Sequence, residues 1–77
     1  MRRGDSLSAL EYYQEELSLD RELVVKEPEN SAFLRSLELA LGRMGQVSLQ
    51  HGQVQQARDY YREKLQIAQQ LWSASPE

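Results

Sequence analysis

The chain contains one nine-residue segment in two versions. ALEYYQEEL begins at Ala9 and ARDYYREKL begins at Ala57, 48 positions later. Alignment of residues 4–29 with residues 52–77 extends the match to nine identical positions of 26. The identical residues are mostly apolar residues, glycine or proline, the types that fix packing and helix ends, whereas the differing positions are mostly polar. We interpret the two stretches as one structural unit present twice.

Length and composition limit the class of protein. Seventy-seven residues allow one small domain, and 40% hydrophobic with 27% charged residues is typical of a folded, soluble chain. No apolar run approaches the roughly 18 residues that a membrane span needs, and no apolar segment of a secretory signal follows Arg2 and Arg3. The absence of cysteine fits a reducing, cytoplasmic compartment. A net charge of −3 argues against nucleic acid as the main partner.

Apolar residues recur at spacings of three and four in three windows, which predict helices over residues 6–26, 31–50 and 54–73. No window alternates like a strand, and short connections make neighbouring helices antiparallel, so the expected fold is all-α. Residues that cap or stop helices stand at the expected ends: Asp5 or Ser6, Pro28, Asn30 or Ser31, Gly52, and Pro76.

The same spacing predicts which side of each helix is buried. In the first helix these residues are Ala9, Tyr13, Leu17 and Val24, with Leu10 and Leu23 beside them. In the second they are Leu34, Leu37, Leu41, Met44 and Ser48, with Phe33, Ala40 and Val47. In the third they are Val54, Ala57, Tyr61, Leu65, Ala68, and Leu71 or Trp72. In each tyrosine pair, the second ring is therefore expected to face the core.

Two glycines lie inside the second helix, where each costs about 1 kcal/mol relative to alanine. Gly42 and Gly45 are three residues apart and share a face. We expect a closely approaching helix to offset this cost, with Ala9 and Ala57 supplying the small surface opposite.

The stretch MGQVSLQHGQVQQARDYYREKL, Met44 to Leu65, resembles the signature of the tetratricopeptide repeat. Three positions depart from that signature: Ser48 replaces its aromatic residue, Lys64 replaces its second small residue, and the proline comes late, at Pro76. The matching residues are Gly45, Gly52, Ala57, Tyr61 and Leu65, and the first copy repeats part of the set as Ala9, Tyr13 and Leu17.

The repeat interval is 48 residues here and about 34 in the usual family member. The chain is similar to a long bacterial variety, in which each helix gains about seven residues, close to two turns. The resemblance makes residues 4–29 the second helix of an incomplete repeat and residues 30–77 one complete helix-turn-helix repeat. All 77 residues then form a single unit with helix order B-A-B. Since stacked repeats bury their faces against neighbours, we expect a fragment of a longer array or a self-associating chain.

The resemblance implies a non-enzymatic scaffold that presents a groove to a peptide or protein partner. First helices line the groove in this family, which carries contact positions over to one face of the second helix here. Gly42 and Gln46 stand where a carboxylate-binding member would have lysine and asparagine. An oligomerisation or spacer segment of a larger regulatory protein is the alternative. The groove residues implied are Arg35, Leu39, Gln46, Leu49 and Gln50, with Gly42 among them.

Catalytic, cofactor and metal sites are not expected. His51 is the only histidine, lacks a His or Cys partner, and suits the end of a helix, where the dipole favours it. The carboxylates Glu11, Glu15 and Glu22 fall on the outer face of the first helix, as a solvated flank does. Trp72 is expected to pack between repeats rather than to bind a ligand.

Charge differs between the two copies. Residues 5–27 carry seven acidic and two basic side chains, whereas the third helix has Arg58, Arg62 and Lys64 against two acidic residues. Glu16 is equivalent to Lys64. Because exposed ion pairs contribute less than about 1 kcal/mol each, this asymmetry predicts a preferred stacking order or dimer arrangement rather than a large stabilisation.

Overall fold

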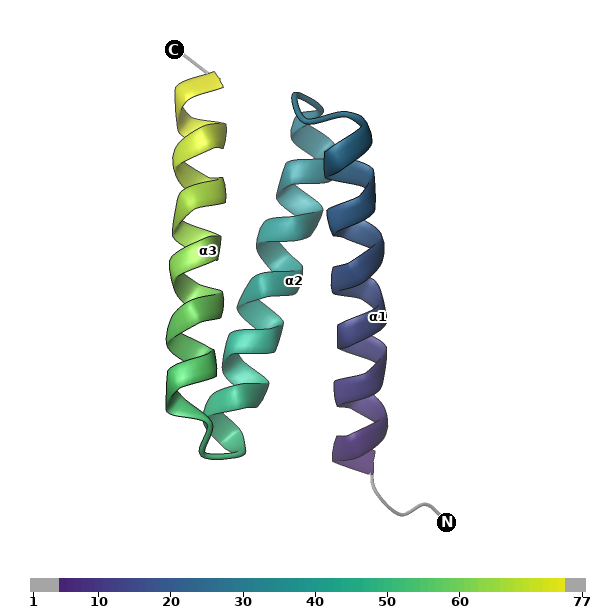
Figure 1. Ribbon diagram of the computed structural model, residues 1–77, viewed down its shortest axis with the longest axis vertical. Coiled ribbons are helices and arrows are strands. Elements are labelled where there is room, and N and C mark those ends of the chain that lie inside the picture. The colour runs from purple at the N-terminus through teal and green to yellow at the C-terminus, as the bar shows by residue number, and fades with distance from the viewer. Residues whose placement is uncertain (1–4, 75–77) are drawn as a thin grey trace.

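Three α-helices make up the structure. The computed structural model describes residues 5–74, in the order α1 (Asp5–Lys26), α2 (Ser31–Gln50) and α3 (Val54–Ala74). Consecutive helices run antiparallel, and α2 lies between α1 and α3 and packs against both (Figure 1). No strand occurs within the described range, so the expected all-α fold is confirmed, with helix bounds that differ from expectation by at most one residue.

The ends of α2 show why the helix starts and stops where it does. The Asn30 side-chain oxygen accepts hydrogen bonds from the backbone N–H groups of Ala32 and Phe33, at 3.0 and 3.2 Å, and so caps the first turn. Gly52 follows the last turn with φ of 74°, a left-handed conformation that suits glycine. Both expected caps are confirmed. The expected caps Asp5 and Ser6, as side chains, and Pro76 lie outside the described residues.

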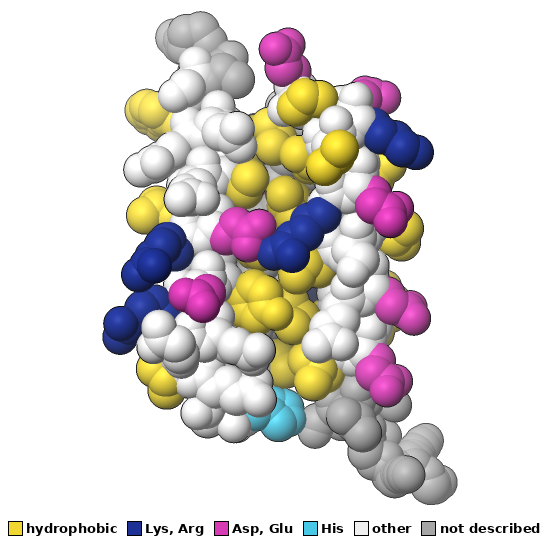
Figure 2. Space-filling view, in the orientation of Figure 1, with side chains coloured by type: hydrophobic (Ala, Val, Ile, Leu, Met, Phe, Trp, Pro, Cys, Tyr) yellow, Lys and Arg dark blue, Asp and Glu magenta, His cyan; other side chains and the backbone are white. Residues whose placement is uncertain are grey.

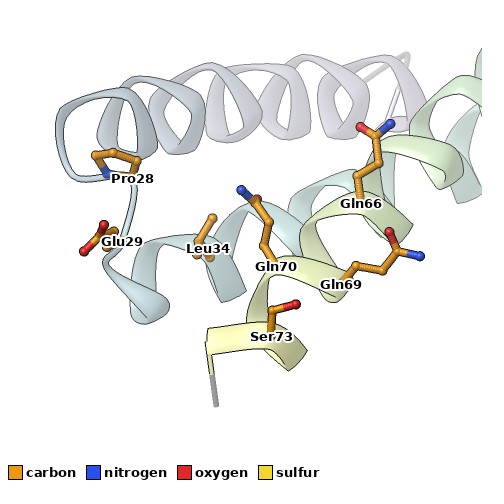
Figure 3. A pocket seen from close by; sticks show the side chains of 7 residues that line it. All are labelled: Pro28, Glu29, Leu34, Gln66, Gln69, Gln70 and Ser73. Carbon is orange, nitrogen blue, oxygen red and sulfur yellow. The ribbon is translucent and has the colours of Figure 1, made fainter. Parts of the chain in front are cut away.

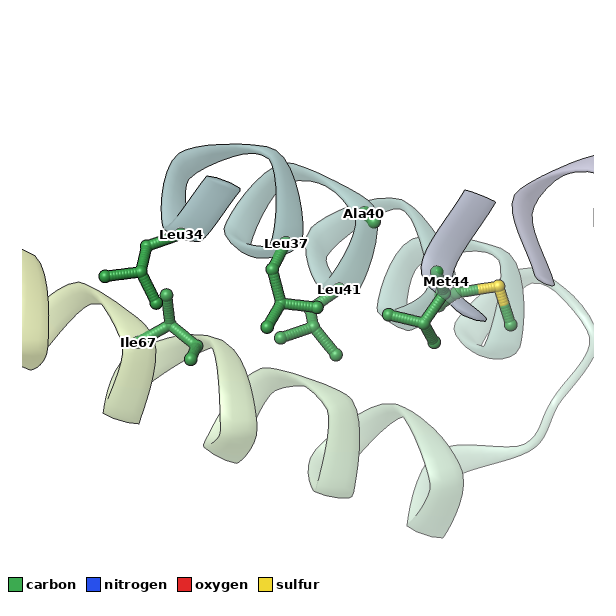
Figure 4. Close-up of a cluster of buried hydrophobic side chains, with 7 residues drawn as sticks. Leu34, Leu37, Ala40, Leu41, Met44 and Ile67 are labelled. Carbon is green, nitrogen blue, oxygen red and sulfur yellow. The ribbon is translucent and has the colours of Figure 1, made fainter. Parts of the chain in front are cut away.

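The core is built around α2. Apolar side chains are seen between the two outer helices in the space-filling view (Figure 2). The expected face of α2 is confirmed, because its main members are buried while Phe33 and Val47 are half-buried. Leu10, Tyr13, Val24, Tyr60 and Leu71 cover the cluster. The buried cluster contains Leu34, Leu37, Ala40, Leu41 and Met44 of α2, Leu17 of α1 and Ile67 of α3 (Figure 4).

The expected buried face of α3 is wrong in part. Ala57 is buried and Ala68 is half-buried, as is Leu71, the one of the two alternatives that holds. Three residues of the expected face are exposed, as is the other alternative. The face that actually meets α2 is rotated around the helix and centres on Tyr60 and Ile67. The reason is that α3 packs against one helix only, so its second apolar side has no neighbour. The exposed residues are Val54, Tyr61, Leu65 and Trp72, at 56%, 38%, 58% and 83%.

The two tyrosine pairs lie differently on their helices. In α1, Tyr13 packs against the core and Tyr12 is exposed, as expected. In α3 the order is reversed, because Tyr60 packs against the core cluster while Tyr61 lies at its edge. The same sequence pair therefore occupies two environments.

Gly45 permits the close approach of α2 and α3. A Cβ atom at Gly45 would lie 2.7 Å from two ring carbons of Tyr61, well inside contact distance. At Gly42 the nearest atom is the Lys64 side-chain carbon Cε, at 3.0 Å. Close approach is thus confirmed, but the expected alanine partners are wrong: an aromatic ring covers Gly45 and a lysine stem covers Gly42.

Among the residues that the structure describes, three ion pairs connect the helices. Arg43 of α2 contacts Glu16 of α1 at 3.0 Å, and Lys64 of α3 contacts Glu38 of α2 at 3.4 Å. Arg21 of α1 reaches Glu63 of α3 at 2.7 Å, across the helix between them. All are partly exposed, so each contributes modestly and sets helix register more than stability.

Candidate protein-binding face

The predicted groove residues share the exposed side of α2. We call this side, formed by Arg35, Leu39, Gln46, Leu49 and Gln50, the α2 face. All five are exposed, while the opposite side of the helix supplies most of the core. Leu39 is 61% exposed and Leu49 is 50% exposed. The side of α2 opposite the core therefore exposes two leucines among polar residues.

A depression between α2 and α3 borders the α2 face. Its volume is about 310 Å³, and Arg35, Glu38, Ala68, Leu71 and Trp72 line it. The indole of Trp72 is largely exposed there, next to one cationic and one anionic side chain. This combination suits a peptide side chain with an apolar body and a charged or hydrogen-bonding end.

A second depression lies between α1 and α2, with a volume of about 220 Å³. The Arg43 guanidinium forms part of its wall, held by Glu16 and lying 5.9 Å from the centre of the Tyr13 ring. His51 ends the helix as expected, and its Nδ1–H donates to the Val47 carbonyl at 2.9 Å. Seven residues line this depression: Ala9, Tyr13, Arg43, Gln46, Val47, Gln50 and His51.

The two depressions divide the predicted groove residues. Arg35 belongs to the α3 side, and Gln46 and Gln50 belong to the α1 side. Leu39 and Leu49 line neither depression but are exposed on the same helix. The predicted residues therefore share one side of α2, with a separate depression on each side of it rather than one common cleft.

The residues of the family signature divide into buried and exposed sets. Gly45 and Ala57 are buried where α2 meets α3, and Leu17 is buried where α1 meets α2. Ala9 and Tyr13, also on α1, are half-buried. Gly52 forms the left-handed turn. Leu65, expected to pack between helices, is exposed, whereas Tyr61 is 38% exposed and its ring still packs on Gly45 of α2.

A further depression was not anticipated from the sequence. It has a volume of about 680 Å³ and lies between the α1–α2 connection and the second half of α3 (Figure 3). Three glutamines and a serine of α3 line it together with Pro28, Glu29 and Leu34. The signal was the run of polar residues at one side of α3. Uncharged amides can bind by hydrogen bonding but supply neither acid nor base. The α3 residues are Gln66, Gln69, Gln70 and Ser73.

Asp20 is a carboxylate of α1 that the sequence pattern does not predict to be buried. It is 8% exposed, and its Oδ2 atom has no hydrogen-bond partner. Burial raises the pKa of the Asp20 carboxyl above its ordinary value of 3.8, and the Glu16 charge raises it further, while Arg43 acts in the opposite direction. The position belongs to the side of α1 that meets α2, so the charge is held at a helix interface.

Replacement of Asp20 by asparagine is expected to stabilise the fold by about 1 kcal/mol at neutral pH, because an unpartnered buried charge is removed. With a raised pKa, the folded chain binds the Asp20 proton more tightly than the unfolded chain does. The destabilisation by the charged Asp20 carboxylate is therefore complete at pH values above the pKa that the group has in the folded chain. It disappears as the pH falls towards 3.8. The stability difference between wild type and Asp20→Asn should narrow on acidification.

Denaturant titrations of both proteins at several pH values measure that difference. Glu11→Gln is the matched control, because Glu11 is exposed on the same helix. A difference that stays constant between neutral pH and the ordinary Asp value would contradict the placement of Asp20.

Three carboxylates of α1 are expected on its outer face. These residues, Glu11, Glu15 and Glu22, are all exposed. Within residues 5–74, no three His, Asp or Glu side chains come together in a way that could hold a metal ion. Among the helices described, none has the length and apolarity to cross a membrane.

Comparison of the chain with protein-family models, curated proteins and solved structures finds no match.

Proposed function

We propose that this chain is a non-enzymatic scaffold for protein interactions, and that the α2 face binds a peptide or a segment of another protein. The observation that carries the proposal is the exposure of Leu39 and Leu49 on α2, flanked by depressions on both sides. Apolar centres with a rim of arginine and amide groups are typical of protein-binding surfaces.

The proposed architecture is that of a long tetratricopeptide-like repeat. Residues 4–29 form the second helix of an incomplete repeat, and residues 30–77 form a complete one, in a cytoplasmic protein. Support comes from the arrangement of the outer helices, which run parallel with α2 between them (Figure 1). Further support comes from Ala9 and Ala57, equivalent positions that are both covered in the structure.

Substitution on the α2 face is expected to weaken partner binding without loss of thermal stability. Arg35→Glu reverses the charge beside Trp72, and Gln46→Ala removes an amide from the other depression. Both side chains are exposed, so the melting temperature should change little. The ligands are peptides selected from a random display library for binding to the wild-type chain. Their affinity should fall by about fivefold or more with either variant.

Gln56→Ala is the matched control for Gln46→Ala, because Gln56 is an exposed glutamine on α3 away from the α2 face. It should leave peptide affinity unchanged. Equal loss of stability and affinity in Arg35→Glu and Gln46→Ala would assign these residues to the fold rather than to binding. Selected peptides that tolerate every change on the α2 face would place the binding surface elsewhere.

A second function, oligomerisation, is favoured by the apolar residues that both outer helices expose. Tyr12 and Leu19 of α1 are 63% and 60% exposed, and Leu65 and Trp72 of α3 are exposed as well. A chain that buries these residues only on self-association gains stability by mass action. A melting temperature that rises with protein concentration supports this function, and a constant one contradicts it.

A further inference from the structure

The internal repeat shows which apolar residues of α3 are left exposed. In α1, the side that meets α2 includes Tyr13, Leu17 and Val24, which are buried or half-buried. Their equivalents 48 positions later are Tyr61, Leu65 and Trp72, and all three are exposed. We call this side of α3, completed by Val54, the α3 edge. Leu65 and Trp72 are open where their equivalents in α1 are covered, while Tyr61 is partly covered because its ring packs on Gly45 of α2.

The reverse holds for α1. The side of α3 that meets α2 includes Tyr60, Ile67 and Leu71. Their equivalents in the first copy are Tyr12, Leu19 and Leu23, which are 63%, 60% and 37% exposed. We call these three residues the α1 edge. Each outer helix thus keeps open the side that its counterpart uses for packing.

The two edges have opposite charge. Glu11, Glu15 and Glu22 are exposed beside the α1 edge, and Arg58 and Arg62 are exposed beside the α3 edge. In the space-filling view, acidic side chains follow the outer side of α1, and basic side chains gather at the outer side of α3 (Figure 2). If the two edges pack together, each covers the exposed apolar side chains of the other. The arginines beside the α3 edge then lie near the glutamates beside the α1 edge.

We propose that the α3 edge of one copy packs against the α1 edge of a second copy, so that the chain assembles head to tail. The two helices run in the same direction in the fold (Figure 1). In the alignment of the two copies, Arg58 corresponds to position 10 and Arg62 to position 14. Position 10 directly precedes Glu11, and position 14 directly precedes Glu15. Copies stacked in register therefore bring opposite charges to the same level.

This contact is heterologous, because two different surfaces meet, and each added copy leaves one edge of each kind open. Assembly therefore continues beyond a dimer, into a closed ring or an open stack. The inference rests on the oligomerisation function proposed above. It competes with peptide binding at the depression beside Arg35, because Trp72 belongs to both surfaces, whereas the depression between α1 and α2 shares no residue with either edge.

Sedimentation velocity over a wide concentration range, combined with tryptophan fluorescence, tests the proposal. Trp72 is the only tryptophan and is 83% exposed, so its emission reports directly on burial of the α3 edge. We expect the sedimentation coefficient to rise with concentration, with a blue shift of the emission over the same range. Salt should weaken the association, since exposed charges are screened.

Charge reversal identifies the surfaces. We expect Arg58→Glu with Arg62→Glu to weaken association by about tenfold, and Glu11→Arg with Glu15→Arg to do the same, because each makes the two edges alike in charge. A mixture of the two double variants should associate again, because every contact between unlike chains then pairs an acidic edge with a basic one. All four residues are exposed, so neither monomer should lose its helical circular dichroism.

The possible results of these experiments separate the head-to-tail inference from oligomerisation in general. Association that tolerates both double variants overturns the head-to-tail inference but leaves oligomerisation standing. Loss of association in the arginine variant alone points to contacts between two α3 edges and also overturns it. A chain that sediments as a monomer at every concentration, with unshifted Trp72 emission, overturns oligomerisation itself.

Discussion

Leu41→Ala is expected to lower the free energy of unfolding by about 2–5 kcal/mol, the largest effect of any single substitution considered. Leu41 has 0% exposure and lies at the centre of the cluster that α2 shares with both neighbours. Removal of its side chain leaves a cavity that three packed helices cannot fill without moving. A core of this size supplies about 3–5 kcal/mol in total, so much of the variant should be unfolded at room temperature.

Urea titration followed by helical circular dichroism measures this effect. Leu39→Ala is the matched control, because it makes the same chemical change two residues away at a side chain that is 61% exposed. The control should stay within about 0.5 kcal/mol of wild type. If Leu41→Ala shows no measurable unfolding transition, Leu41→Val should still show one, with an intermediate loss of unfolding free energy. Equal effects at positions 39 and 41 would contradict the observed orientation of α2.

Gly45→Ala is expected to destabilise the fold by about 1–3 kcal/mol, although alanine is the better helix former. The added Cβ would meet the Tyr61 ring at 2.7 Å, so either the ring or the whole of α3 must move. Gly42→Ala is the matched control. There the nearest atom belongs to the flexible stem of Lys64, which can shift, and a gain of about 0.5–1 kcal/mol is expected.

The opposite signs of these two glycine variants make a sharp test in thermal or urea unfolding. Tyr61→Ala should remove most of the cost of Gly45→Ala, because the overlapping ring is gone. A double-mutant cycle between positions 45 and 61 measures this coupling directly. Additive effects, or stabilisation by both glycine substitutions, would mean that α2 and α3 do not approach closely at Gly45.

The sequence predicts α2 well for a physical reason. This helix has neighbours on two sides, so its wide apolar face, from Leu34 to Ser48, leaves little choice of orientation. The caps at Asn30 and Gly52 depend on local hydrogen bonding and backbone conformation, which the residue types themselves determine. The exposure of the α2 face follows from the same pattern.

The outer helices show what a sequence pattern leaves open. α3 has two apolar sides, and periodicity alone does not say which one a neighbour will cover; Ile67 is buried while Leu65 is exposed. Likewise, Asp20 looks like its acidic neighbours, and only the packing of α1 on α2 shows that it is buried. These differences arise from tertiary contacts, which local spacing does not encode.

The central position of α2 has a consequence for how the chain folds. α1 and α3 each pack against the helix that adjoins them in sequence, so the contacts that build the core are short in chain separation. Such a topology has little loop-closure entropy to overcome, so fast folding is expected. Both helical pairs share α2, so whichever pair forms first presents a ready surface to the third helix.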